Sequence, residues 1–442
     1  MALEFASRHE TFPRYKTFTM ELAGRPLVVE TGKMCGLSNG SCLVRYGETV
    51  VLCNVTMSEK PREGIDFFPL SVEFEEKLYS VGRITGSFMR REGRPGEKAI
   101  LTSRVVDRPI RPLFPKEMRN DVCVTMTVMS VDQDCSPEIT GMIGTSIALS
   151  ISEIPWKGPI GGVFMGLVDG ELVVNPTLEQ REKSDLQLTV AATEQKIVMI
   201  EAGANEVDET TMLNAIKMAH TEIKKVIAFI NGIVAEIGKP KVEFQSADLD
   251  MNLYHAVKDK YLDDFKAAMD TDDKNVRDAR LSPIRARLEE EYPDLDAATI
   301  ELIMYKMQKF VVRRWLLDEG KRVDGRGINE IRPLAAEVGL LPRVHGSGMF
   351  TRGQTQVLTV CTLGNTKDSQ LMDDLGTEPY KRYIHHYNFP PYSVGEARAP
   401  RSPGRREIGH GALAERALLP MIPSQEEFPY TIRLVSEVLS KS

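Results

Sequence analysis

Short alternating segments dominate the first part of the chain. Apolar and polar side chains alternate along residues 19–32 and 41–56, and each segment contains a glycine turn, around Ala23–Pro26 and Tyr46–Glu48. Alternation with a period of two places one face of a strand against a core, and a glycine turn lets the chain reverse. We therefore predict two β-hairpins, followed by another strand within Asp66–Glu75.

Helices and strands then follow one another up to Pro240. Residues 99–114 have helical spacing, and Pro109 and Pro112 should end that helix because proline lacks the backbone N–H that continues it. The remaining predicted elements are a strand over Cys123–Val131, a buried helix over Ile139–Ile151, hairpins over Gly162–Val174 and Leu186–Ile200, and a long amphipathic helix over Asp208–Ile237. This mixture predicts an α+β domain over residues 1–240.

Residues 241–320 lose the strand pattern. Charged residues abound there, and apolar positions recur at helical spacing, as in residues 299–317. We predict an all-helical domain that acts as a spacer over residues 241–320. A turn-rich linker, Lys321–Gly327, ends it.

The sequence contains two copies of one unit. Ser38–Thr56 recurs 306 residues later as Val344–Thr362, and Pro95–Pro115 recurs 308 residues later as Pro403–Pro423. More loosely, residues 121–130 match residues 427–436, again with a shift of 306. The repeat predicts a second α+β domain over residues 321–442.

The second copy ends earlier in its pattern than the first. The first copy continues for about 110 residues beyond the strand that ends at Ser130, whereas the second stops at Ser442. We therefore expect the second domain to be incomplete, with its core and sheet edge open, as in a fragment or a truncated chain.

Composition narrows the function classes. The formal net charge of −7 gives no support to non-specific nucleic-acid binding by the whole molecule. Locally, however, ten Lys or Arg residues stand against four acids between Arg83 and Arg119. No apolar run long enough to span a membrane and no secretory leader is visible, so we expect a cytoplasmic protein without a membrane partner. The six cysteines show no C-x-x-C pair, and no zinc site is predicted.

Arg405, Arg406 and His410 form the first candidate site. They lie in a tight loop after Pro403–Gly404, just before the predicted start of a short helix, where arginine forks and helix N-terminal amides both favour phosphate. The first copy has Glu97 and Lys98 at the positions of the two arginines, so the second copy is the better candidate for phosphate chemistry. A solvated pair of surface arginines and a histidine that caps local backbone are the alternatives.

Phe88, Arg90, Arg91 and Arg94 form the second candidate site, in a glycine-bearing loop. Cationic side chains that follow a phosphate backbone, beside a ring that stacks on bases, are typical of single-stranded nucleic-acid binding. A mobile surface loop without a ligand is the alternative. Arg83 and Arg104 could line the same surface or pair with Glu73, Glu75 and Glu76.

The common catalytic motifs are missing. The sequence has no phosphate-binding P-loop, dinucleotide fingerprint, G-x-S-x-G elbow or H-E-x-x-H helix. His385 and His386 lie in a strand pattern that sends them to opposite faces, which argues against a shared metal.

Several long motifs resemble one family. DFFPLSVEFEEKLYSVG, SFMRREGRPGEKAILTSRVVDRPIRPLFP, VDGRG, HHYNFPPYSVGE and PGRREIGHGALAERAL are similar to bacterial polynucleotide phosphorylases, in order, from about Phe18 to Ser440. The resemblance implies an α+β fold: two RNase PH-like domains, built from ribosomal protein S5 domain 2-like βαβα units, joined by a helical domain. It also implies 3′ to 5′ phosphorolysis of RNA, which releases nucleoside diphosphates and is reversible.

The resemblance assigns roles and partners as well. Arg405 and Arg406, with His410 close by, match the family's phosphate and RNA-end residues, and Arg90 and Arg91 match its RNA-gripping loop. It implies inorganic phosphate as co-substrate, Mg²⁺ or Mn²⁺ as cofactor, single-stranded RNA rather than DNA as partner, a homotrimer, and possible degradosome-type protein partners. The family's phosphate-binding serine turn, its catalytic acids with any metal ligands, and its KH and S1 modules match positions beyond Ser442, so we expect this chain to be inactive alone.

Two other functions stay open on the sequence. One is a non-catalytic RNA-binding or assembly subunit, as the first copy itself suggests. The other is a hydrolytic nuclease, for which no paired-carboxylate metal cluster is visible. Diphosphate rather than monophosphate products would separate phosphorolysis from hydrolysis.

Overall fold

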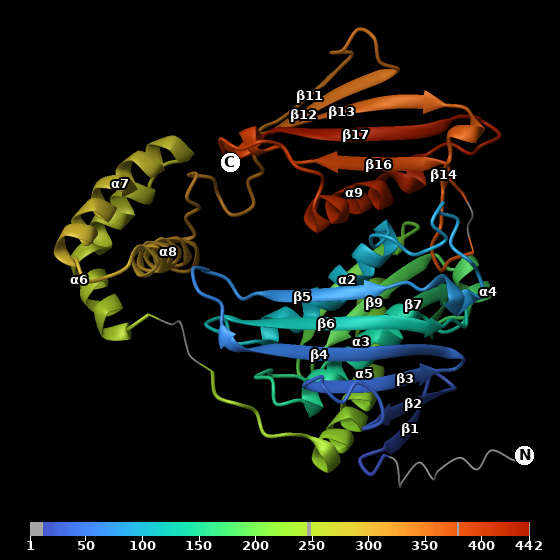
Figure 1. Cartoon of the computed structure of the whole chain (residues 1–442). Coiled ribbons are helices and arrows are strands. Elements are labelled where there is room, and N and C mark those ends of the chain that lie inside the picture. Colours follow the sequence, from blue (N-terminus) through green and yellow to red (C-terminus); the bar gives the residue numbers. More distant parts are fainter. Residues whose placement is uncertain (1–11, 245–248, 378–379, 442) are drawn as a thin grey trace, which may run out of the picture.

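The first domain is built on a six-stranded sheet (Figure 1). The computed structural model describes residues 12–244, 249–377 and 380–441. The strand order is β1-β2-β3-β4-β6-β5, and only the β5–β6 pair is parallel. The strands are β1 (Lys16–Leu22), β2 (Arg25–Thr31), β3 (Gly40–Tyr46), β4 (Thr49–Pro61), β5 (Leu70–Glu75) and β6 (Asn120–Ser130). The hairpins predicted over residues 19–32 and 41–56 are confirmed, and so are the strands predicted within Asp66–Glu75 and Cys123–Val131.

A second sheet and a buried helix complete this domain. The sheet has the order β10-β9-β7-β8, from β7 (Gly161–Val168), β8 (Glu171–Val174), β9 (Leu186–Ala192) and β10 (Ile197–Ala204). Helix α3 (Pro137–Ile151) packs against both sheets, and every residue from Ile139 to Ile151 is buried. A Cβ at Gly144 would come within 2.4 Å of the Cys53 sulfur, so glycine permits this close packing. The long helix α5 (Glu209–Ile237) covers β7 and β9.

Three helices form the predicted helical domain at the side of the molecule (Figure 1). They are α6 (Met251–Met269), α7 (Lys274–Glu291) and α8 (Ala297–Arg314), and the π-helical turn η3 (Trp315–Glu319) continues α8. Their apolar faces form a separate core around Val257, Phe265 and Ile303. The prediction of an all-helical region is confirmed.

The second domain repeats the first sheet. Its order β11-β12-β13-β17-β16, again with one parallel pair at the β16 edge, equals β2-β3-β4-β6-β5. The elements are β11 (Leu334–Val338), β12 (Gly346–Arg352), β13 (Thr355–Gly364), β14 (Gln370–Leu371), β15 (Tyr380–Lys381), β16 (Tyr383–Asn388), α9 (Arg405–Leu418) and β17 (Thr431–Ser440). Strand β11 is exposed along its whole length, and Val338 is 86 % exposed.

The sheet register corrects one sequence match. Leu52 pairs with Thr127 in the first domain, whereas Leu358, 306 residues after Leu52, pairs with Glu437, 310 residues after Thr127. The shift of 306 for this strand was therefore wrong, and residues 121–130 correspond to residues 431–440. The two shifts differ by an even number, so both preserve the alternation of buried and exposed side chains.

Two equivalent helices join the domains. Helix α2 (Glu97–Ile110) ends one residue after Pro109, as the prolines predict, and packs against α9, which lies on the side of the second sheet that faces the first domain (Figure 1). Lys381 forms ion pairs with Glu97 of α2, at 3.4 Å, and with Glu415 of α9, at 2.8 Å. In the described part of the chain, no helix is both long and apolar enough to cross a membrane.

Candidate functional site

The start of α9 is organised by its own backbone and side chains. The Gly404 N–H donates to the Glu407 carboxylate at 2.8 Å, which satisfies one of the free amides at a helix start. Arg406 and His410 are exposed one turn apart on this helix. The structure therefore presents a cation and an imidazole on adjacent turns of α9, whereas the sequence placed both in a loop before the helix; the helix begins earlier than predicted.

Aromatic rings of the neighbouring strand support these two side chains. The Arg406 guanidinium lies 6.0 Å from the centre of the Phe389 ring, and the Lys441 ammonium lies 5.1 Å from the same ring. The His410 ring stacks on Tyr387 at 5.2 Å between centroids. Two rings at the end of β16 therefore hold three basic side chains in place.

A fourth basic side chain comes from the first domain. Gly409 gives Arg104 room, because a Cβ there would lie 2.5 Å from the Arg104 Nε. We call the set of Arg104, Arg406, His410 and Lys441 the α9 cluster. Within the residues that the structure describes, Arg104, Arg406 and Lys441 form no ion pair. The sequence connected Arg104 only with the second candidate site, around Phe88 and Arg90, or with the acids Glu73, Glu75 and Glu76. Gly409, a helical glycine, was the missed signal.

The cluster changes the ionisation of its histidine. Burial lowers the pKa of His410 below its ordinary value of 6.5. The surrounding positive charges act in the same direction; they belong to Arg406, Arg104 and Lys441. His410 is therefore neutral at pH 7, so one ring nitrogen can accept a hydrogen bond and the other can donate one.

Arg405 occupies a different environment from Arg406. One of its guanidinium nitrogens donates to the Val72 carbonyl oxygen at 2.7 Å, and another pairs with the Glu73 carboxylate. Both acceptors belong to β5 of the first domain. Arg405 thus links the domains in this structure, and its predicted contact with phosphate stays a prediction.

The loop that carries Phe88 is presented to solvent. We call residues 83–96 the basic loop; Phe88 is 99 % exposed, and Arg90, Arg91 and Arg94 are exposed as well. Arg90 has φ = +50° and donates to the Thr85 carbonyl oxygen at 3.2 Å. Among the described residues, no hydrogen bond or ion pair joins this loop to the α9 cluster.

The other histidines have local partners. His385 is buried, and its ring nitrogens lie 3.0 Å from the Tyr383 hydroxyl and 2.9 Å from the Ser436 hydroxyl. His386 is exposed on the opposite face of β16, as the alternation predicts. Residues 12–244, 249–377 and 380–441 contain no group of three His, Cys, Asp or Glu side chains that could hold a metal ion.

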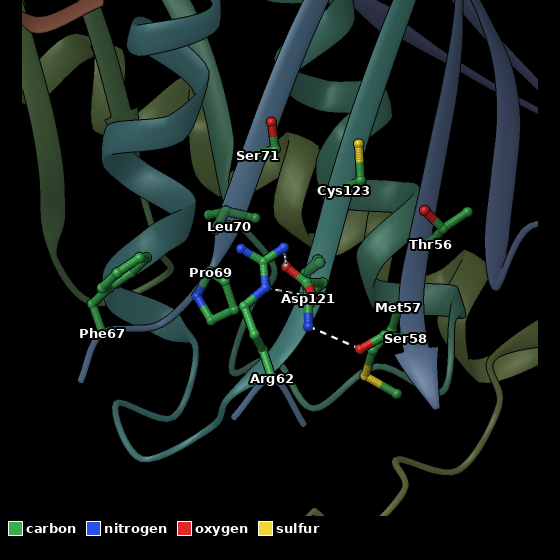
Figure 2. Close-up of a pocket in the computed structure, with 11 residues that line it drawn as sticks. Thr56, Met57, Ser58, Arg62, Phe67, Pro69, Leu70, Ser71, Asp121 and Cys123 are labelled. Atoms are coloured by element: carbon green, nitrogen blue, oxygen red, sulfur yellow. Dashed lines mark hydrogen bonds and ion pairs between the residues drawn. The ribbon is translucent and has the colours of Figure 1, made fainter. Parts of the chain in front are cut away.

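A cavity of about 520 Å³ lies elsewhere, at β4, β5 and β6 of the first domain (Figure 2). Its one arginine, Arg62, is neutralised by Asp121 at 2.6 Å, and the Asp121 N–H is satisfied by the Ser58 hydroxyl at 2.9 Å. Because these polar groups satisfy one another, the cavity lacks the unpaired cations of the α9 cluster. It is the weaker candidate site.

Comparison with known proteins agrees with the repeat. The profile described as "3' exoribonuclease family, domain 1" matches residues 23–155 and 330–442, which is more than half of the chain. "3' exoribonuclease family, domain 2" matches residues 158–222, within the first domain. "Polyribonucleotide nucleotidyltransferase, RNA binding domain" matches residues 252–327, the region that the sequence suggested only as a spacer.

Individual relatives are similar over nearly the whole chain. The polyribonucleotide nucleotidyltransferase of Ruminiclostridium cellulolyticum is 59 % identical over 429 residues, and that of Heliobacterium modesticaldum is 56 % identical over 431. These matches cover 96 % and 97 % of this chain, and the chain spans 61 % of the length of either relative. By its repeated domains the chain belongs to the 3′ exoribonuclease family, and it is similar to polyribonucleotide nucleotidyltransferases over nearly its whole length.

Proposed function

We propose that this chain provides part of the active site of a phosphorolytic 3′ to 5′ exoribonuclease, which shortens RNA with inorganic phosphate and releases nucleoside diphosphates, and that the chain is inactive alone. The observation that carries the proposal is the α9 cluster, in which three cations from both domains lie around the His410 imidazole. The Glu407 charge opposes their effect on His410, but among the described residues none of the three cations forms an ion pair. Family membership supports the same assignment, since the named relatives are polyribonucleotide nucleotidyltransferases.

The proposed reaction brings two anions together. A phosphate oxygen forms a bond to the phosphorus of the last phosphodiester, the bond from that phosphorus to the 3′ oxygen of the preceding nucleotide breaks, and this oxygen takes up a proton. The products are a nucleoside diphosphate and an RNA one nucleotide shorter. Because both reactants are negative, most of the catalytic effect must come from positioning and charge neutralisation.

The cluster supplies the groups that this reaction needs. Arg406 is exposed and supported by the Phe389 ring, so its guanidinium is free to bind phosphate oxygens through two parallel hydrogen bonds. Arg104 and Lys441 add positive charge, and His410 can donate a hydrogen bond to a phosphate oxygen. We assign Phe88, Arg90, Arg91 and Arg94 to binding single-stranded RNA, upstream of the reacting end.

Binding measurements test the assignment of Arg406. In Arg406→Ala, we expect inorganic phosphate to bind about tenfold more weakly or worse, because a charged hydrogen-bonding group is lost. Arg45, exposed on β3 without an ion pair among the described residues, provides the matched control Arg45→Ala. Equal phosphate affinity in the two variants would refute the proposed site.

Product analysis separates the proposal from its alternatives. Any nucleotide that a polypeptide containing this chain releases from RNA should be a diphosphate and should require phosphate. Monophosphate products would support hydrolysis instead. RNA binding without phosphate-dependent release, in such a polypeptide with the metal supplied, would support a non-catalytic RNA-binding or assembly subunit.

The remaining properties suggested by the resemblance belong to the same proposal. They are a requirement for Mg²⁺ or Mn²⁺, a homotrimer, a cytoplasmic location and degradosome-type partners. Metal dependence is tested by adding a chelator during turnover, and the trimer by sedimentation. Competition between RNA and DNA oligonucleotides tests the preference for RNA.

A further inference from the structure

A segment of the second domain reaches into the first. Residues 372–377, which we call the linking segment, follow β14, and the Leu375 side chain is only 5 % exposed because it packs within the first domain's hydrophobic core. The Gln133 side-chain amide of the first domain donates to the Leu375 carbonyl oxygen at 3.0 Å. The linking segment is therefore fixed to the first domain by an apolar anchor and a hydrogen bond.

One carboxylate of this segment holds the start of the basic loop. The Asp373 Oδ1 accepts from the Arg83 guanidinium at 3.1 Å, and its Oδ2 accepts from the Gly86 backbone N–H at 3.3 Å. Arg83 also donates to the Asp374 carbonyl oxygen at 3.1 Å. Asp373 thus fixes both a side chain and the backbone, two residues before Phe88.

Asp374, the next residue of the linking segment, lies near the helix turn that follows the basic loop. The Lys98 ammonium, in the first turn of α2 just after the loop, lies 4.0 Å from the Asp374 carboxylate. Asp374 is itself oriented by the Gly376 N–H at 2.7 Å. Adjacent acids of the second domain therefore contact the start of the basic loop and the first turn of the helix that follows it.

Between these ends, a hydrogen bond ties the loop to its own domain: the Glu92 carboxylate accepts from the Leu78 N–H at 3.2 Å. The internal hydrogen bonds of the loop include the Ser87 hydroxyl to the Arg91 carbonyl oxygen at 3.1 Å and Arg90 to Thr85 at 3.2 Å. Phe88, Arg91 and Arg94 project into solvent. A loop that is already ordered loses little conformational freedom when RNA binds. Ordering the loop in advance therefore raises the affinity for RNA without any new contact.

We propose that Asp373 is a positioning residue for RNA binding: from the second domain it orders the basic loop of the first, so that Phe88, Arg90 and Arg91 are held ready for single-stranded RNA. This inference rests on the proposed RNA-binding role of the loop. It connects the two proposed subsites, because the domain that carries Arg406 also sets the conformation of the loop that grips RNA.

Hydrogen exchange of the RNA-free chain tests the ordering directly. In Asp373→Ala, we expect faster amide exchange over residues 84–94, with exchange in α3 and the thermal midpoint unchanged. Glu426→Gln is the control, since Glu426 is an exposed acid of the second domain without a contact to the loop. Unchanged exchange over residues 84–94 would overturn the proposal, whatever happens to RNA affinity.

RNA affinity tests the consequence. A fluorescent oligoadenylate should bind Asp373→Ala about fivefold more weakly or worse. Arg83→Ala should have a similar effect, and the loss in the double variant should be smaller than the sum of the single losses, because both changes remove the shared Arg83–Asp373 contact. Fully additive losses would contradict this mechanism.

Arg91→Ala distinguishes failure of this inference from failure of the RNA-binding role. If Arg91→Ala weakens RNA binding and Asp373→Ala does not, the positioning role is refuted and the loop's RNA-binding role stands. If neither variant changes RNA affinity while loop exchange rises in Asp373→Ala, the RNA-binding role of the loop is refuted, and this inference falls with it.

Discussion

Individual residues of the α9 cluster and its surroundings show what the sequence pattern can predict and what it cannot. Arg406 and His410 lie on adjacent turns of α9, whereas the sequence placed them in a loop just before the helix, since glycines such as Gly409 and Gly411 disfavour helix. The contacts of Arg405 with Val72 and Glu73 span more than 330 residues of sequence. Nothing in the local pattern distinguishes Arg405 from Arg406, so only the packing of the domains could separate a linking arginine from an exposed one.

The charge environment of His410 makes a prediction at this scale. Replacing Arg104 by glutamine removes a positive charge that lowers the pKa of His410, so we expect this pKa to rise toward 6.5. A nuclear magnetic resonance titration of the histidine signals measures it. Arg45→Gln should leave the pKa unchanged, and equal values in both variants would show that Arg104 does not act on the imidazole.

Glu138 makes a second prediction at the residue scale. Burial and the nearby Glu201 carboxylate raise the pKa of Glu138 from 4.5 to about 7, against the smaller effects of a hydrogen bond from Thr189 and the charges of Arg416 and Lys98. A raised folded-state pKa means that the native state binds the proton more tightly than the unfolded state does. Folding stability due to this group is therefore present below pH 4.5 and is lost as the pH rises to about 7.

The variant Glu138→Gln should remove this loss of folding stability at high pH. Its free energy of unfolding at pH 8 should exceed that of the parent by on the order of 3 kcal/mol at most, and the two should converge near pH 4.5. Urea unfolding at several pH values measures the difference. A difference in unfolding free energy between the two proteins that does not change with pH would show that the Glu138 carboxyl keeps an ordinary pKa.

At the scale of elements, the sequence predicts whether a segment is a helix or a strand better than it predicts how the strands pair. Hairpins, the buried helix α3 and the long helix α5 follow from alternation, small residues and helical spacing, all of which are local. The pairing register of β17 cannot be predicted in this way, because a repeat shift of 306 and one of 310 both leave the same face of the strand buried. The shift is 308 up to Pro423 and 310 in β17, so two of the additional residues lie between Pro423 and β17, in a segment without a periodic pattern that could reveal them.

The contact of α9 with β5 predicts a stabilising role for Arg405. Arg405→Ala removes a half-exposed ion pair and a hydrogen bond to a backbone carbonyl, so we expect a loss of about 1–2 kcal/mol in the free energy of unfolding. Phosphate affinity should fall less than in Arg406→Ala. A large loss of phosphate affinity at unchanged stability would instead show that Arg405 is a phosphate ligand.

At the scale of the whole molecule, the internal repeat was the most informative feature of the sequence. It predicts two similar domains, and the two sheets have the same strand order and the same single parallel pair. It cannot predict how the copies meet. The linking segment reaches from the second domain into the core of the first, yet Leu375 has the sequence context of an ordinary loop residue.

The position of Leu375 predicts that a change in one domain is felt in the other. Leu375→Ala should destabilise the first domain by about 2–4 kcal/mol, since it leaves a void in that domain's core. Faster hydrogen exchange should follow in α3 and β6, and Leu371→Ala, at a 64 % exposed position, should have little effect. Exchange that rises only in the second domain would contradict this coupling.

One carboxylate serves both copies of the repeat. Arg108 of α2 and Arg416 of α9 are equivalent residues, 308 positions apart, and both pair with Glu201 of β10. After a duplication the two arginines could change independently, but each now depends on the same acid. A substitution at position 201 would leave two cations unpaired at once, so we expect evolution to tolerate change less at Glu201 than at either arginine.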